Sequence, residues 1–136
     1  MRQYDTIESE DLYDMAVEWM ERGDFEKAEH QLKRAISLNP RFIYAYITLA
    51  RLYGRVKNYS MAVGLLKKAR EQDPAFHRLD YLMAKYAYKA GDYPLSLRCI
   101  EKAIEKSPEM LYRKSREVIR RASGSAFSAR AGGATV

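Results

Sequence analysis

The residues best suited to chemistry in this 136-residue chain are basic side chains that recur at a fixed interval. Arg51 is followed by Lys85 at the same interval that separates Arg55 from Lys89. If each pair occupies equivalent places in neighbouring structural units, like charges line up on one face and favour an acidic partner. The alternative is a solvated helix face, where exposed charges contribute little.

The side chains that usually carry catalysis or hold metals are few and scattered. The sequence contains two histidines, His30 and His77, and one cysteine, Cys99. Their spacing fits neither a zinc site nor a cysteine–histidine nucleophile pair, and no phosphate loop, nucleotide fingerprint or nucleophile elbow occurs. We therefore expect no enzyme activity, no metal and no cofactor.

Composition indicates a folded protein outside the membrane. Hydrophobic residues make up 47% of the chain and charged residues 31%, and no apolar run approaches the roughly 20 residues that span a bilayer. The first residues after Met1 are polar, and a single cysteine excludes an internal disulfide, which fits a reducing compartment. We expect a cytoplasmic location.

Charge is distributed unevenly along the chain. Residues 1–40 contain 5 Lys and Arg against 10 Asp and Glu, whereas residues 41–136 contain 19 against 8. The basic part is able to attract an acidic protein segment, a nucleic acid or an anionic membrane, and charge alone does not choose among them.

Three similar segments follow one another along the sequence. They read GDFEKAEHQLKRAISLNP at 23–40, KNYSMAVGLLKKAREQDP at 57–74 and GDYPLSLRCIEKAIEKSP at 91–108. Between them lie stretches with helical periodicity, whose apolar positions we expect to be buried, such as Leu12, Met15, Ala16 and Trp19. Each unit is therefore predicted to be helix, tight turn, helix, with a glycine or equivalent at the turn and a capping Asp or Asn after it.

Small residues recur at fixed places in these units. They are Ala16, Ala50 and Ala84 in the first helices, and Ala28, Ala62, Ser96, Ala35, Ala69 and Ala103 in the second helices. Small side chains let two helices approach closely where they cross. A helix pair cannot bury its apolar stripe alone, so the units must stack, and the predicted fold is an all-α solenoid.

These features resemble the tetratricopeptide repeat (TPR) family. The resemblance covers residues 9–108 as repeats 9–42, 43–76 and 77–108, after a lead-in at 1–8. It rests on the 34-residue period, on the patterns LYDMAVEW and YITLARLY, and on the closing prolines. Residues 109–122 resemble the family's solvating helix, and we expect its side with Met110, Leu111, Val118 and Ile119 to cover the last apolar face of the stack. The Gly/Ala/Ser-rich residues 123–136 are expected to form a flexible tail.

The third repeat departs from the family pattern. Asp80 stands where a large apolar residue is expected, and Ala87 stands where a second aromatic is expected. Lys57 replaces the turn glycine of the second repeat. We expect the first helix of the third repeat to pack loosely.

The resemblance implies a binding groove on the concave face, lined by the first helix of each unit. The residues that this mapping places in the groove are Tyr13, Val17, Tyr44, Ile47, Arg51, Arg55, Arg78, Tyr81, Lys85, Tyr88 and Lys89. The implied function is a non-catalytic adaptor, assembly factor or chaperone that holds an acidic, partly apolar peptide or helix.

Some family members grip a C-terminal carboxylate through a Lys–Asn–Asn–Lys–Arg set. The matching positions here carry Tyr13, Val17, Thr48, Arg78 and Leu82, of which only Arg78 is compatible. We do not expect this chain to use that carboxylate clamp.

Two alternatives from other classes remain open. The basic C-terminal part, especially Arg113–Arg121, is able to contact RNA or a membrane surface, although no nucleic-acid motif is present and nucleic acid is not the expected partner. The acidic first repeat of one chain is also able to meet the basic end of another, which would give head-to-tail self-association.

Overall fold

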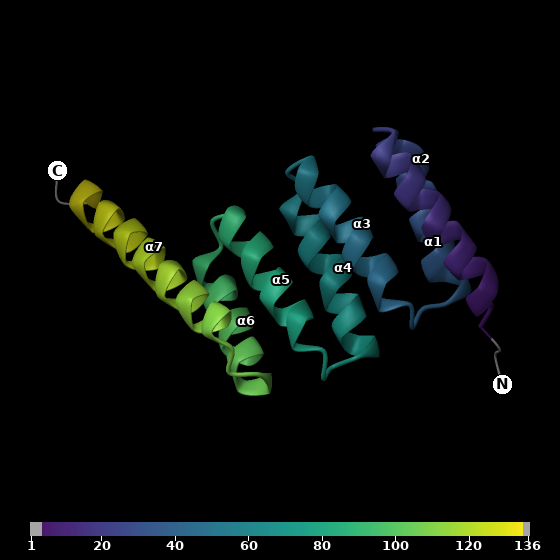
Figure 1. The fold of residues 1–136 in the computed structure, drawn as a ribbon. Helices are drawn as coiled ribbons and strands as arrows, with labels where there is room; N and C mark the ends of the chain where they lie inside the picture. The colour runs from purple at the N-terminus through teal and green to yellow at the C-terminus, as the bar shows by residue number, and fades with distance from the viewer. Residues whose placement is uncertain (1–3, 135–136) are drawn as a thin grey trace. The chain divides into compact units, whose positions relative to one another are not determined.

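The computed structural model describes the backbone of residues 4–134 and the side chains of residues 4–125. The described backbone forms seven α-helices and no strand, which confirms the predicted all-α fold (Figure 1). The helices are α1 (Thr6–Glu21), α2 (Phe25–Leu38), α3 (Ile43–Arg55), α4 (Tyr59–Gln72), α5 (His77–Lys89), α6 (Tyr93–Lys106) and α7 (Met110–Ala134).

The chain forms two compact units, Met1–Pro74 and Ala75–Val136. In the first unit α1 packs on α2, α2 packs on α3, and α3 packs on α4. In the second unit α6 packs on both α5 and α7. The paired helices lie side by side and are joined by tight turns, as the repeated segments predict (Figure 1).

Each second helix begins at a capping side chain. The carboxylates of Asp24 and Asp92 and the side-chain oxygen of Asn58 accept hydrogen bonds from the backbone N–H three residues later, at 3.1, 3.2 and 3.4 Å respectively. These bonds satisfy backbone donors that have no partner inside the helix. The predicted caps are therefore confirmed at all three second helices.

The residue before each of these caps has a left-handed backbone. Gly23 and Gly91 both have φ of 81°, and Lys57 has φ of 62°. Glycine adopts this conformation readily, whereas a side chain with a Cβ atom is strained in it. The fold thus imposes the same turn on all three repeats and holds Lys57 in an unfavourable backbone conformation.

The small residues lie at the helix crossings. Ala16, Ala28, Ala50 and Ala62 are fully buried. In the second unit Ser96 occupies the small position of α6, and its Oγ donates a hydrogen bond of 2.7 Å to the carbonyl oxygen of Ala84 on α5. A contact this short between two helices requires a small residue on each side.

Part of the predicted core of α1 is wrong. Met15 is 45% exposed, and Trp19 is only partly buried. Leu12 and Ala16 are buried, because they lie on the face of α1 that meets its neighbours, whereas Met15 lies beside that face. The Lys27 ammonium lies 4.3 Å from the centre of the Trp19 ring, so the indole makes a cation–π contact instead of filling the core.

The interior face of α7 also differs from the prediction. Met110, Leu111 and Val118, expected on the covered side with Ile119, are 70%, 53% and 51% exposed. Tyr112 and Ile119 are the buried pair, at 3% and 4% exposure. These two residues lie two helical turns apart on one face of the helix.

The helix α7 continues past residue 122, where the solvating helix was expected to end. It runs through residues 123–134, part of the segment that we expected to be a flexible tail. Alanine, the strongest helix former, recurs in this segment and no proline interrupts it. Residues 135–136 and the side chains after Ser125 lie outside the described residues.

The left-handed Lys57 gives a stability prediction. We expect Lys57→Gly to increase the free energy of unfolding by about 1 kcal/mol, because glycine removes the Cβ strain at positive φ. Urea unfolding followed by circular dichroism measures this change.

A matched control is available in the first turn. A Cβ atom added at Gly23 would meet no heavy atom within 4 Å, so Gly23→Ala changes the backbone preference without a steric clash. We expect Gly23→Ala to destabilise the protein by a similar amount. A Lys57→Gly variant that is less stable than the parent would contradict the assignment of strain.

Candidate functional site

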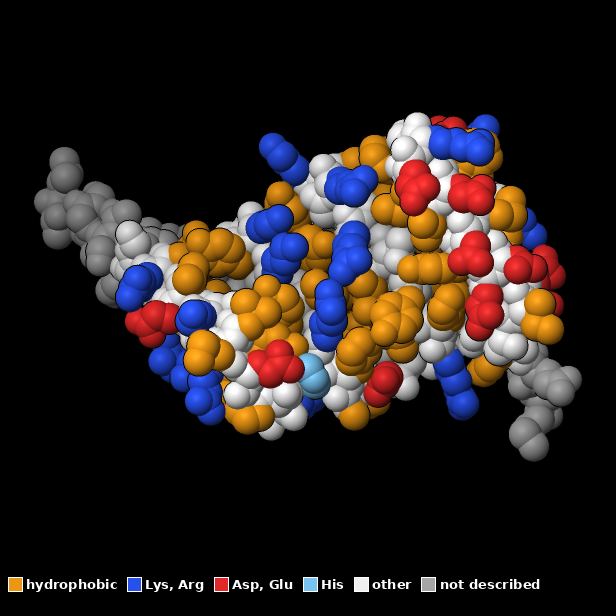
Figure 2. All heavy atoms as spheres, viewed as in Figure 1, with side chains coloured by type: hydrophobic (Ala, Val, Ile, Leu, Met, Phe, Trp, Pro, Cys, Tyr) orange, Lys and Arg blue, Asp and Glu red, His pale blue; other side chains and the backbone are white. Residues whose placement is uncertain are grey.

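The predicted binding residues lie on the first helices of the three repeats, α1, α3 and α5. In the first unit α3 presents Tyr44, Arg51 and Arg55, all of them exposed, with Tyr44 at 59%. Figure 2 shows acidic side chains over α1 and basic side chains over α3 on the visible face of this unit. The guanidinium of Arg55 lies 5.7 Å from the centre of the Phe25 ring, which restricts its position.

Three other predicted residues of the first unit are less exposed to solvent. The Tyr13 hydroxyl and the Thr48 hydroxyl are 3.1 Å apart, and the Tyr13 ring packs on Phe42 with 5.1 Å between ring centres. Val17 is partly buried, and Ile47 is only 3% exposed. Tyr13 therefore ties α1 to α3, and Ile47 fills the core rather than offering contact surface.

In the second unit α5 presents the remaining predicted residues. Arg78, Lys85, Tyr88 and Lys89 are exposed, and Tyr81 is partly buried. The spacing of Tyr81, Lys85 and Tyr88 by four and three residues places them on one face of the helix. Basic side chains gather over α5 on the face seen in Figure 2.

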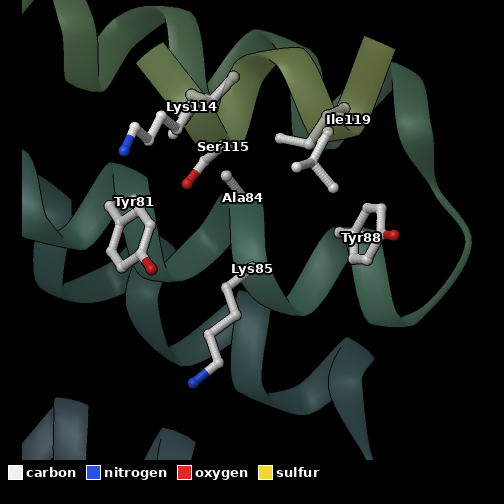
Figure 3. Close-up of a pocket in the computed structure, with 9 residues that line it drawn as sticks. Tyr81, Ala84, Lys85, Tyr88, Lys114, Ser115 and Ile119 are labelled. Carbon is white, nitrogen blue, oxygen red and sulfur yellow. The ribbon is translucent and has the colours of Figure 1, made fainter. Parts of the chain in front are cut away.

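A pocket of about 240 Å³ lies between α5 and α7. Figure 3 shows Tyr81, Lys85 and Tyr88 projecting from α5, with Lys114, Ser115 and Ile119 on the α7 side. The residues that line the pocket are Tyr81, Ala84, Lys85, Tyr88, Ile100, Lys114, Ser115, Val118 and Ile119. The pocket thus joins three of the predicted groove residues to a helix that we expected only to cover the stack.

Sequence reasoning missed the α7 half of this pocket, although a signal was present. Ser115 follows Tyr81 at the interval that separates Lys85 from Arg51, and Val118 follows Ala84 at the same interval. The period of the repeats therefore continues onto α7 and gives it the register of a further first helix.

Leu82, one of the positions matching the carboxylate clamp, is buried at 4% exposure.

Tyr112 fixes α7 against α5. Its hydroxyl is 2.7 Å from Nδ1 of His77, and its ring stacks on Tyr81 with 5.1 Å between centres and 26° between planes. Burial and the nearby Glu109 carboxylate raise the pKa of Tyr112 above its ordinary value, so the hydroxyl stays neutral at physiological pH. This contact sets the distance between the two walls of the pocket.

Asp80 fixes α5 against α6. Its carboxylate is fully buried and lies 2.6 Å from the Lys106 ammonium, whose side chain is 27% exposed. The expected loose packing of α5 is therefore not seen at this position, because Lys106 extends its apolar stem inward and places its charge on the carboxylate. The ion pair substitutes for the large apolar residue that occupies the same place in the first two repeats.

Metal-binding side chains are not clustered in the part of the chain that the structure describes. No group of three or more His, Cys, Asp or Glu side chains among them is arranged to hold a metal ion. Cys99 is buried at 2% exposure. None of the helices in the described part of the chain is both long enough and apolar enough to cross a membrane.

Comparison with known proteins confirms the family resemblance. A family model described as "Tetratricopeptide repeat" matches residues 20–86. This match shows that residues 20–86 are built of tetratricopeptide repeats, and the solved structures below share the TPR fold over most of the chain. A comparison of the sequence with curated proteins finds no match.

Solved TPR domains share the fold at low sequence identity. The Sgt2 TPR domain from Aspergillus fumigatus is 20% identical, with a TM-score of 0.79 over 92% of this chain and 85% of that one. The first TPR of Spaghetti (RPAP3), bound to an HSP90 peptide, SRMEEVD, is 13% identical, with a TM-score of 0.77 over 90% and 96%.

A third structure is the second TPR domain of human RPAP3 in complex with an HSP70 peptide, SGPTIEEVD. It is 15% identical, with a TM-score of 0.72 over 85% of this chain and 94% of that one.

The Asp80–Lys106 pair gives a prediction for the element that carries the site. We expect Lys106→Met to lower the free energy of unfolding by about 3 kcal/mol, because it leaves a buried carboxylate without its cation. Adding Asp80→Leu to that variant should recover most of the loss, since Leu12 occupies the equivalent place in the first repeat. Chemical denaturation of both variants measures the difference, and a double variant no more stable than Lys106→Met would contradict this role of the pair.

Proposed function

We propose that this protein is a non-catalytic interaction module that binds an acidic, partly apolar segment of another protein along its first helices. The observation that carries the proposal is that α3 and α5 each expose basic and tyrosine side chains. Arg51 and Lys85 occupy the same place in successive repeats, and both side chains are exposed, as are those of Tyr44 and Tyr88.

The mixture of side chains selects the chemistry of the partner. Exposed Arg and Lys beside aromatic rings favour a ligand that supplies carboxylates together with apolar contact area. Tyrosine offers a large rigid surface at a low cost in conformational entropy, which is why it is frequent in binding surfaces. A purely ionic partner would not need the tyrosines.

Two structural neighbours support a peptide as the ligand. The RPAP3 domains are described with the HSP90 peptide SRMEEVD and the HSP70 peptide SGPTIEEVD, which combine glutamates and an aspartate with apolar residues. By analogy, the same fold in this chain is suited to an extended acidic segment.

The mode of binding should differ from a C-terminal carboxylate clamp. Of the matching positions, Tyr13 and Thr48 bond to each other, and Leu82 is buried. Arg78 alone is both basic and exposed. We therefore propose that the partner is recognised through internal acidic and apolar residues and not through a free C-terminus.

The test is selection from a display library of short random peptides with the intact chain as bait. The selected peptides should combine Asp or Glu with large apolar residues and bind without a free C-terminal carboxylate. The double variant Arg51→Glu/Lys85→Glu should weaken their binding by about tenfold or more, because it replaces attraction with repulsion at both sites. Fluorescence anisotropy gives the affinity, and circular dichroism checks that helicity is retained.

The matched control is Lys68→Glu/Lys102→Glu. Both lysines are exposed, they are separated by the same interval as Arg51 and Lys85, and they belong to the second helices α4 and α6. This variant makes the same change in net charge away from the proposed surface, so it should bind almost as the parent does. Equal loss in both variants would indicate attraction to net charge alone, and selection of no peptide would overturn the proposed function.

A further inference from the structure

The pocket between α5 and α7 points to a specific feature of the partner. We propose that it receives one large apolar side chain, such as Phe or Leu, from a segment with acidic residues beside that anchor. This inference rests on the proposed function and adds to it the place and the chemistry of the anchor. It also assigns a binding role to α7.

The size and lining of the pocket fit an apolar anchor. Its floor and walls include Ala84, Ile100, Val118 and Ile119, and its volume is about 240 Å³. An apolar cavity of roughly 150 Å³ is enough to take up benzene. One aromatic or branched aliphatic side chain therefore fits, whereas a cluster of several does not.

Val118 is the exposed aliphatic residue of this lining. It is 51% exposed, although Ile100 and Ile119, which line the same pocket, are buried. An inserted apolar side chain would cover Val118 and remove its surface from water, which favours binding.

Two lysines on different helices set the charge beside the pocket. Lys85 of α5 and Lys114 of α7 both line it and both are exposed. In Figure 3 the Lys114 amino group lies on the Tyr81 side of the pocket, and Tyr88 lies at the other end. The Lys85 side chain extends away from α7, and its Nζ lies 5.8 Å from the centre of the Tyr86 ring. A carboxylate next to the anchor on the Tyr81 side would therefore meet the positive charge of Lys114, while Lys85 adds to the positive potential on the α5 side of the pocket.

The walls of the pocket are held before any ligand arrives. Ser96 bonds the Ala84 carbonyl at 2.7 Å, which fixes α5 on α6. Tyr112 stacks on Tyr81 and reaches His77, which fixes α7 on α5. A site that is already in its binding geometry pays little ordering cost, so one anchor side chain is able to contribute measurable affinity.

The direct probe is an amidated peptide with a central phenylalanine and two aspartates on each side. Titration of the full chain should move the NMR methyl signals of Val118 and Ile119 in a saturable way. Replacing the phenylalanine by serine should weaken binding by between about tenfold and a hundredfold, the factor expected for losing one buried large side chain. Replacing the aspartates by asparagines should weaken binding and remove most of its salt dependence.

A protein variant tests the location independently. Ser115→Phe places a ring in the pocket from α7 and should weaken peptide binding by about tenfold or more, whereas Met110→Phe is the matched control. Met110 lies on the same helix, is 70% exposed and does not line the pocket. Thermal unfolding of both variants verifies that the fold is kept.

The outcomes separate this inference from the proposed function. Binding that is insensitive to the phenylalanine-to-serine change, or that survives Ser115→Phe in a folded protein, overturns the pocket as anchor site. If the peptides selected by display still depend on Arg51 and Lys85 in that case, the proposed function stands without the pocket. Methyl shifts that appear only on self-association of the chain, measured by light scattering, would also overturn the inference.

Discussion

The close crossing of paired helices at small residues is the constraint on which the rest of this structure depends. Ala50 and Ala62 in the first unit, and Ala84 and Ser96 in the second, are buried at no more than 1% exposure, so a larger side chain is expected to overpack the crossing. Where serine replaces alanine, its hydroxyl bonds directly to the backbone of the neighbouring helix. Because these small residues recur with the period of the repeats, equivalent faces of successive first helices carry equivalent positions of the sequence.

The fold tolerates two departures from the repeat pattern away from the helix crossings, and a neighbouring residue compensates for one of them. Asp80 replaces a large apolar residue and is matched by Lys106, which arrives from the neighbouring helix with both an apolar stem and a charge. Lys57 replaces a glycine and remains strained, since its side chain offers no remedy for a left-handed backbone. The ion pair with Lys106 thus compensates for Asp80, whereas the strain at Lys57 is offset by the stability of the rest of the unit.

The sequence was sufficient to predict the helices, their caps and the small residues at the crossings. These features depend on local chemistry and on the repeat period of the sequence, as the regularly spaced caps Asp24, Asn58 and Asp92 show. The exposure of Arg51 and Lys85 followed from the same period. Whether the predicted groove residues bind a partner remains a prediction.

Other features depended on side-chain packing that the period does not specify. Ile47 was expected at the surface and lies in the core, while Val118 was expected in the core and lies at the surface. Neither error changes the fold, because both residues are apolar. The pairing of Asp80 with Lys106 joins residues on different helices and has no signature along the chain.

The role of α7 was the main point that sequence reasoning undervalued. A covering helix needs only an apolar face, and Tyr112 with Ile119 supplies it. The same helix adds Lys114, Ser115 and Val118 to the pocket, because it continues the register of the repeats. A helix that closes the core of a repeat array is thereby placed to contribute to the proposed binding surface.

The measurement that tests the central constraint most directly is the unfolding free energy of Ala50→Phe, compared with Arg51→Phe at the exposed neighbouring position. Overpacking the crossing of α3 and α4 should lower the stability by about 1–3 kcal/mol, whereas the exposed substitution should change it by no more than about 0.5 kcal/mol. An Ala50→Phe protein as stable as the Arg51→Phe protein would show that the helices do not meet closely at this residue, and would contradict the account.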